Sequence, residues 1–303
     1  MLVIFYFRED EENMDNKEKS AEIVSKYENI FKCPLCKSPM RVVGLKSLIC
    51  SNNHTFDIAK QGYVNVMTRP SNSRYDKRLF EERHKINMES DLYTLLHEKM
   101  VEIIEEHMDV FNDPIVILDA GCGEGSHLQR ILEGCKNEAL AGVGLDISKE
   151  GIRMAARKYR ESIWLVGDLA NSPVADQACH VIVNILSPAN YMDFKRILVP
   201  GGLIIKVVPR VNYLKELREV LFADTEKEIF KNDETVTLFK ERFHLVTNFN
   251  LNYTKQLNSA ELASLVQMSP LAWSAKKERI DSFINRGSSE ITVDLDILVG
   301  LNK

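Results

Sequence analysis

Short apolar runs alternate with amphipathic segments from residue 114 onward. Five runs lack polar alternation, which is typical of parallel strands buried on both faces: 115–121, 139–148, 162–168, 179–186 and 201–209. Apolar residues recur at helical spacing in four further segments: 126–134, 149–159, 191–198 and 213–222. Strands joined by helices in this order predict an α/β fold, a doubly wound sheet covered on both faces.

The C-terminal part of the chain breaks this alternation. Two long apolar stretches, 244–257 and 291–301, flank a helical pattern at 260–268. We expect both stretches to be strands, the last of them antiparallel to its neighbours. They would complete a seven-stranded sheet.

The N-terminal part predicts three further units ahead of an α/β domain at 111–303. Residues 1–25 are acidic and lack apolar periodicity, which indicates a mobile leader with a helix beginning near Ser20. A small cysteine-containing module spans 26–68. A basic linker, rich in the breakers Pro, Ser and Asn, then leads into helices within 69–110.

Targeting signals are not expected in this sequence. The apolar residues 1–7 follow no basic region and precede an acidic stretch, which is the wrong layout for a signal peptide. No run of eighteen apolar residues occurs, so we expect no membrane contact. These features predict a cytoplasmic protein.

Composition and charge refine this picture. A hydrophobic content of 45% and a charged content of 27% are typical of a globular protein. The net charge of −5 is uneven, because residues 31–85 carry eleven lysines and arginines against four acids, a net +7. A basic segment of this kind indicates contact with phosphates. A solvated surface of chance sign is the alternative.

Half of the cysteines lie close together with a histidine. Cys33 and Cys36 are separated by two residues, Cys50 follows after thirteen, and His54 after three more. This spacing predicts a tetrahedral zinc site whose four protein ligands leave no position for a reactive water, so the zinc would be structural. Unrelated reduced cysteines in a core are the alternative. The remaining cysteines are scattered and are interpreted as small buried hydrophobes: Cys122, Cys135 and Cys179.

A glycine-rich loop follows the first strand of the α/β domain. Gly121, Gly123 and Gly125 would let the backbone approach a nucleotide at the carboxyl end of that strand, with Asp119 two places before them. A dinucleotide fingerprint would read G-x-G-x-x-G. The different spacing argues against a dehydrogenase.

Acids also follow the second and third strands. Asp146 is placed where a carboxylate could accept both hydroxyls of a ribose. Asp168 could accept from an exocyclic amine, with the amide of Leu169 beside it. The alternative is that these aspartates only cap loops.

These motifs resemble those of a known family. "LDAGCGEG", "GLDIS", "GDL" and "LVPGGLIIKVVP" are similar to successive motifs of class I S-adenosylmethionine (SAM)-dependent methyltransferases, whose sheet order is 3-2-1-4-5-7-6. Together with "CPLC", "AKQGYVNVM", "SPAN" and "MSPLAW", they resemble the RlmA-type 23S rRNA (guanine-N1)-methyltransferases, a group that includes macrolide-resistance enzymes. The resemblance runs from about Phe31 to Lys303.

The resemblance implies roles for individual residues. It makes Gly123 and Glu124 part of the cofactor loop and Tyr93 a cofactor contact. Tyr213 stands where the family pattern usually shows a histidine near the cofactor, so the sequence departs from the pattern there. Ordinary packing in a helix is the alternative for either tyrosine.

The implied activity is SAM-dependent methylation of guanine N1 in a hairpin loop of 23S rRNA. The zinc module and the basic linker would hold the hairpin through its phosphates. Asn190 and Tyr191, after the fourth strand, are weak candidates for contacts with the target base, and His127 is interpreted as a surface or packing residue. No general base is evident. A homodimer through the zinc modules is a further expectation.

Two other readings stay open. A small-molecule methyltransferase would share the catalytic domain, and a non-catalytic RNA-binding protein could retain the whole fold. The basic module argues against the first, and the intact glycines and acids argue against the second.

Overall fold

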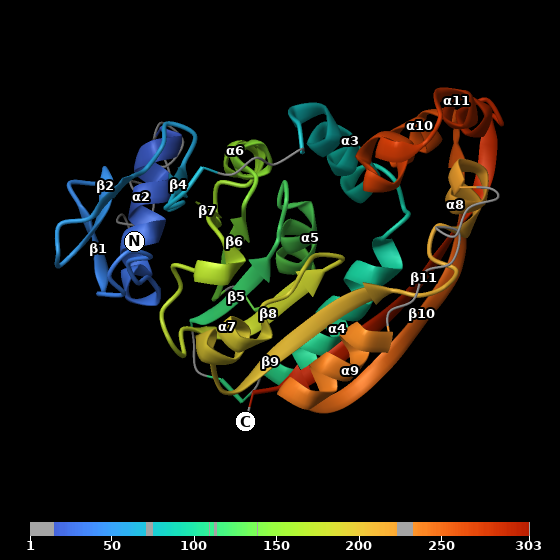
Figure 1. Ribbon diagram of the computed structural model, residues 1–303. Helices are drawn as coiled ribbons and strands as arrows, with labels where there is room; N and C mark the ends of the chain where they lie inside the picture. The colour runs from blue at the N-terminus through green and yellow to red at the C-terminus, as the bar shows by residue number, and fades with distance from the viewer. Residues whose placement is uncertain are drawn as a thin grey trace, which may run out of the picture.

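The structure is a computed structural model that describes residues 15–70, 75–108, 110–111, 114–137, 139–222 and 233–302. A mixed sheet of eight strands dominates it, in the order β10-β11-β9-β8-β5-β6-β7-β4 (Figure 1). The strands are β4 (Tyr63–Asn65), β5 (Ile115–Ala120), β6 (Leu140–Asp146), β7 (Ile163–Val166), β8 (Cys179–Ile185), β9 (Leu198–Pro209), β10 (His244–Asn258) and β11 (Ser288–Leu301).

Strand directions confirm the methyltransferase order in β5 to β11, which reads 3-2-1-4-5-7-6. β5 runs parallel to β6 and β8, and the parallel pairing continues to β7 on one side and β9 on the other. β11 is antiparallel to both β9 and β10, as expected for the closing strand. Every residue of β5 is buried, because helices cover both faces of the sheet.

The seven predicted strands of the α/β domain are present, and an eighth strand that was not predicted, β4, extends the sheet from outside that domain. β4 belongs to the cysteine-containing module and pairs in parallel with β7, with Val64 opposite Leu165. Val64 is fully buried, so the module shares backbone hydrogen bonds and core with the α/β domain. A three-residue strand whose partner lies a hundred residues away leaves no periodic signal in the sequence.

Helices form a layer on each face of the sheet. One core includes side chains of α3 (Lys77–Met88), α4 (Thr94–Met108), α5 (Ser126–Gly134), α6 (Lys149–Lys158), α8 (Lys215–Phe222), α10 (Ser259–Met268) and α11 (Lys277–Ile284). The core on the other face includes side chains of α2 (Asn16–Lys26), α7 (Tyr191–Ile197), α9 (Asp233–Arg242) and the cysteine-containing module. No described helix is long and apolar enough to cross a bilayer.

The predicted leader overlaps α2, and this part of the prediction needs correction. Asp15 caps the helix by accepting hydrogen bonds from the backbone N–H of Lys17 and Glu18 at 2.8 and 2.9 Å. Ala21 and Val24 are fully buried. The helix predicted to begin near Ser20 is present but begins four residues earlier, at Asn16. Residues 1–14 lie outside the described part of the chain.

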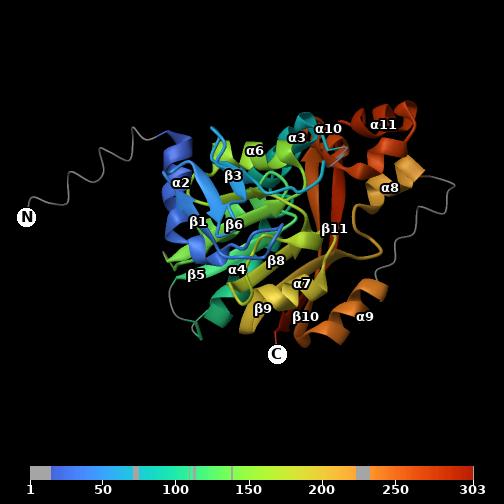
Figure 2. The ribbon, with the colours of Figure 1, turned by 60° about the vertical axis from the view of Figure 1, so that its left-hand side comes forward.

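The cysteine-containing module covers a gap on its face of the sheet. Between β7 and β8 the chain forms only a short 3-10 helix, η2 (Leu169–Asn171). Backbone hydrogen bonds tie the module to the segment after it, from Lys32 N to Pro173 O and from Ala175 N to Ile30 O, both at 2.7 Å. Within the module, β1 (Met40–Val43), β2 (Ser47–Cys50) and β3 (Thr55–Asp57) form a small antiparallel sheet (Figure 2).

Candidate functional site

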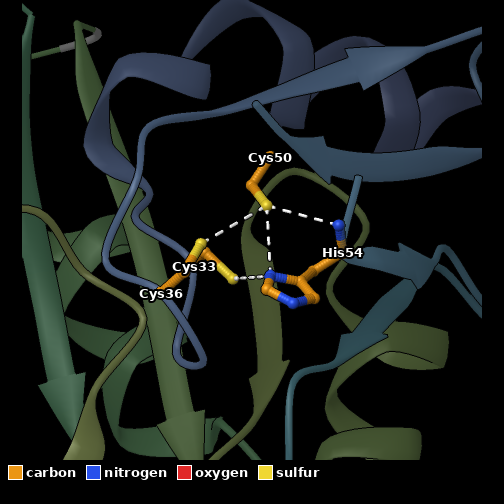
Figure 3. Close-up of side chains that lie close together, drawn as sticks. All are labelled: Cys33, Cys36, Cys50 and His54. Atoms are coloured by element: carbon orange, nitrogen blue, oxygen red, sulfur yellow. Dashed lines mark hydrogen bonds between the residues drawn. The ribbon is translucent and has the colours of Figure 1, made fainter. Parts of the chain in front are cut away.

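The four predicted metal ligands converge at one end of the module. The ligand atoms of Cys33, Cys36, Cys50 and His54 all lie within 4.8 Å of one another. The His54 Nδ1 atom lies 3.4 Å from both the Cys33 and the Cys50 sulfur, and the Cys36 and Cys50 sulfurs are 3.6 Å apart (Figure 3). The knuckle between Pro34 and Ser38 and the turn after β2 bring them together.

The donor set fits zinc. Three thiols and one imidazole within a few ångströms are a common tetrahedral set for structural zinc, and all four positions are protein ligands. Hydrogen bonds from the side chain and backbone of Ser38 lower the pKa of Cys36 to about 5, which favours the thiolate that a metal requires. The geometry therefore supports a closed, structural site.

The glycine loop forms a sharp elbow after β5. Gly121, Gly123 and Gly125 have φ angles of +87°, +58° and +82°, a region that L side chains rarely adopt. A Cβ at Gly121 would clash with the Ser187 side chain, and one at Gly125 would clash with the ring of Trp164. The backbone conformation of the loop therefore favours glycine at these three positions, even without a ligand.

Three acids meet at this elbow. Asp146 accepts hydrogen bonds from Gly123 N at 2.9 Å and Ser148 N at 2.7 Å, so one carboxylate fixes both loops. Asp119 and Glu124 are each 1% exposed. Burial, followed by the charges of Asp146 and Glu124, raises the pKa of Asp119 well above its usual value. Burial also raises the pKa of Asp146 and of Glu124.

This acidic elbow fits a cationic nucleoside such as SAM. The Oδ2 atom of Asp119 is buried and has no hydrogen-bond partner among the described residues. Positive charge placed beside the three carboxyls would offset their mutual repulsion. SAM carries a sulfonium, an ammonium group and a ribose, which match an acidic site with open acceptors.

A cavity adjoins the elbow at the carboxyl ends of β6 and β7. Its volume is about 450 Å³, within the usual range of small-molecule sites. Ile147 and Ser148 line it from the α/β domain, and Asn65, the last residue of β4, and Met67 line it from the module. The module therefore contributes to the walls of this cavity, which is lined by Ser148 next to the elbow but by none of the predicted cofactor residues.

The helix α3 closes over the elbow. Its Asn87 donates hydrogen bonds to Glu124 Oε1 at 3.3 Å and Ser126 Oγ at 2.7 Å. The guanidinium of Arg83 lowers the pKa of both Glu124 and Asp146, which partly offsets the effect of burial. In the sequence this segment was marked by an apolar helical pattern and by the basic charge of residues 31–85, so neither side chain was predicted to lie at the elbow.

Two tyrosines predicted to lie near the cofactor contact one another. The hydroxyls of Tyr93 and Tyr213 are 2.5 Å apart, and the Tyr93 ring packs edge-on against His127. His127 Nδ1 lies 2.8 Å from His97 Nε2. Burial lowers the pKa of His97 to about 4 and that of His127 well below its usual value, so both imidazoles are neutral near pH 7. His127 is thus a packing residue beside the elbow.

Asp168 and Leu169 lie after β7, where the sequence placed them. Asp168 is exposed and accepts a hydrogen bond from Ala170 N at 2.8 Å, which caps η2. The carbonyl of Leu169 accepts one from the Asn190 side chain at 3.0 Å. Asp168 therefore caps a loop, as the alternative interpretation of this residue expected. Its contact with a cofactor stays a prediction.

The structure gives both weak catalytic candidates structural contacts. Asn190 caps α7 by accepting a hydrogen bond from Asp193 N at 3.3 Å. The Tyr191 ring packs among Phe194, Phe239 and Phe243. Its placement in this aromatic core opposes the predicted contact with a target base, because the apolar ring is buried under α9 instead.

Comparisons with known proteins agree with this geometry. Residues 31–73 match the model of the RlmA N-terminal zinc ribbon, and residues 117–202 match that of a methyltransferase domain. The chain is 30% identical to the 23S rRNA (guanine(748)-N1)-methyltransferase of Streptomyces fradiae over 89% of its length and 95% of the relative. It is 39% identical to YxjB of Bacillus subtilis over 90% of its own length and 97% of the relative. The name of YxjB carries a provisional 23S rRNA (guanine-N1)-methyltransferase assignment.

The chain belongs to the 23S rRNA (guanine-N1)-methyltransferase family. Among solved structures, a SAM-dependent methyltransferase from Aquifex aeolicus matches 76% of this chain and all of its own, with a TM-score of 0.46 and 11% identity.

This methyltransferase also contains a buried lysine that the sequence analysis missed. Lys206 of β9 is 4% exposed, and its Nζ donates to Asn184 Oδ1 at 2.6 Å and to the Ser187 carbonyl. Asn184 donates in turn to the carbonyls of Ala120 and Pro188, so the pair fastens the "SPAN" loop to the elbow. The signal was a single charge inside the apolar run 203–208.

Replacing Lys206 by Met tests how the buried charge affects the stability of the protein. Burial lowers the pKa of Lys206 to about 8 from 10.5, so the unfolded state binds more protons between these values. The free energy of unfolding of the wild type, relative to the variant, should rise as pH increases from 8 to 10.5. Urea unfolding at several pH values measures this difference, and a pH-independent difference would contradict the burial of a charged lysine.

Proposed function

We propose that this protein transfers a methyl group from SAM to N1 of a guanine in a hairpin loop of 23S rRNA, in the cytoplasm. The observation that carries the proposal is the presence, on one chain, of the acidic glycine elbow and a Cys3His module that share one sheet. The S. fradiae relative, aligned over 95% of its length, carries the guanine-N1 activity in its name.

The elbow residues would hold the cofactor. Asp146 would accept the ribose hydroxyls, the glycines would admit the nucleoside close to the backbone, and Asp119 and Glu124 would face its positive charge. In the module, Cys33, Cys36, Cys50 and His54 would bind one zinc ion that stabilises the fold. Both assignments follow from the donor atoms and their burial.

Methyl transfer needs alignment more than covalent work by the protein. SAM would supply an activated methyl group on a sulfonium, and its transfer to guanine N1 would release a neutral thioether and the N1 proton, which passes to water. The chain orients the reactants and excludes competing water. Because N1 is blocked in a base pair, the guanine must be unpaired, which favours a loop as the substrate.

The basic segment would hold the RNA. Residues 31–85 carry a net +7, and they include most of the zinc module and most of α3, which covers the elbow. Contacts with phosphates would therefore place the hairpin beside the cofactor site. A homodimer through the zinc modules stays a prediction, which sedimentation of the purified protein checks.

Tritiated SAM distinguishes this function from its rivals. We expect label to pass to fragments of 23S rRNA that contain hairpin loops. The affinity of the protein for these fragments should fall as the salt concentration increases. Label transferred only to small metabolites would instead establish a small-molecule methyltransferase. Binding of RNA without binding of SAM would establish a non-catalytic RNA-binding protein.

A further inference from the structure

A second cavity lies between α3, α10, α11 and the 3-10 helix η4 (Pro270–Ser274). Its volume is about 300 Å³. The lining combines a flat aromatic ring, apolar side chains and polar groups, namely Arg78, Glu82, Val266, Gln267, Trp273 and Ile280. Such a mixture suits a planar heterocycle with polar edges better than a purely apolar ligand.

Exposed aromatic surface marks the rim of this cavity. Trp273 is 46% exposed, although tryptophan is usually well buried. Its ring centroid lies 5.3 Å from that of Tyr75, which in turn lies 6.1 Å from Phe80. The Arg83 guanidinium lies 6.0 Å from the Tyr75 ring. Aromatic faces and arginine planes are the surfaces on which unpaired RNA bases stack.

Basic side chains lie at and near the wall of this cavity. Glu82 is compensated, because it pairs with Lys85 at 2.9 Å and accepts a hydrogen bond from Ser264 at 2.6 Å. Arg78 adds positive charge at the wall, and the exposed Lys276 and Lys277 follow η4 directly. A base in the cavity would thus have cationic side chains near its phosphates.

The cavity is separate from the cofactor elbow. Arg78 and Glu82 share one face of α3, since they are four residues apart. Phe80 and Arg83 lie on the other face, where a Cβ on Gly123 would come within 3.3 and 3.1 Å of them. The cavity of about 450 Å³ is lined by Tyr75, which contacts Trp273 at 5.3 Å between ring centroids, so the two cavities adjoin near the start of α3 while different faces of the helix meet the elbow and the second cavity.

We infer that this cavity binds an unpaired base that neighbours the methylated guanine, with Trp273 as its stacking surface. The inference rests on the proposed function, since it needs an RNA whose target guanine occupies the elbow side of α3. The second base would fix the register of the loop, so that one guanine among several is presented to the cofactor. Trp273 is a specificity-determining residue in this account, and no bond is made or broken there.

Trp273→Ala tests this role, because an exposed side chain can be removed without unfolding the protein. We expect the affinity for an unmodified 23S rRNA fragment that the wild type methylates to fall about tenfold, while the affinity for SAM, measured by calorimetry, is unchanged. Trp273→Phe should recover most of the loss, because it keeps an aromatic face. Leu95→Ala, which removes a 40% exposed apolar side chain from α4, is the matched control and should bind RNA normally.

Abasic substitutions in the RNA identify the base. At one position beside the target guanine, removing the base should weaken binding to the wild type but not to Trp273→Ala, since the two changes remove the same contact. Equal RNA affinity of the wild type and Trp273→Ala would overturn the inference, and so would additive losses at every position. If the wild type neither binds nor methylates the RNA, the proposed function fails together with it.

Discussion

Asp146→Ala is expected to abolish SAM binding, with a loss of at least about 100-fold. The carboxylate organises the elbow through Gly123 and Ser148, and it would accept two ribose hydroxyls. Hydrogen bonds to a charged group contribute about 1.5–3 kcal/mol each, so losing two of them gives this magnitude. Isothermal titration with SAM measures it directly.

The zinc content of the same variant shows whether the effect is local. Asp146→Ala should keep one zinc ion per chain, because Asp146 lies outside the Cys3His cluster. Glu102→Ala removes a carboxylate whose side chain is 54% exposed on α4, and its SAM affinity should equal that of the wild type. An Asp146→Ala protein that bound SAM normally would exclude the elbow as the cofactor site.

Cys50→Ser is expected to lose zinc and to unfold the module. A closed structural site contributes folding free energy outright, about 10–16 kcal/mol in isolated zinc-finger peptides. Because β4 of the module pairs with β7, the loss should reach the edge of the large sheet. We expect zinc to fall from one ion per chain to nearly none and the Tm to fall by about 10 °C or more.

Cys135→Ser provides the matched control for this change. Cys135 is half-buried at the end of α5 and is not part of the cluster. Its replacement should leave the zinc content at one per chain, as measured by elemental analysis of the purified protein. A Cys50→Ser protein with full zinc and an unchanged Tm would remove the metal from this account.

Much of the fold could be predicted because its strands are buried on both faces. Ile115 to Ala120 and the other central strands leave continuous apolar runs, and glycines mark the elbow. The Cys3His spacing is local in sequence, so the cluster was predictable residue by residue. These features depend on neighbours along the chain.

The elements that were missed depend on distant partners. β4 is a strand only because β7 offers an edge, and the early start of α2 at Asn16 depends on its Asp15 cap and on packing against the module and the sheet. The direction of Tyr191 was unpredictable for the same reason, since Phe239 of α9 and Phe243, directly after that helix, lie far along the chain. Asn87 reaches Glu124 only after α3 folds over the elbow.

Nucleoside analysis of the methylated RNA tests the central claim most directly. A 23S rRNA fragment is incubated with the protein and SAM, digested to nucleosides and analysed by mass spectrometry, and reverse transcription then locates the block. The account predicts 1-methylguanosine at a single unpaired guanine of a hairpin loop, formed by the wild type and absent with Asp146→Ala. Methylation at another atom or another base, or no methylated nucleoside at all, would contradict it.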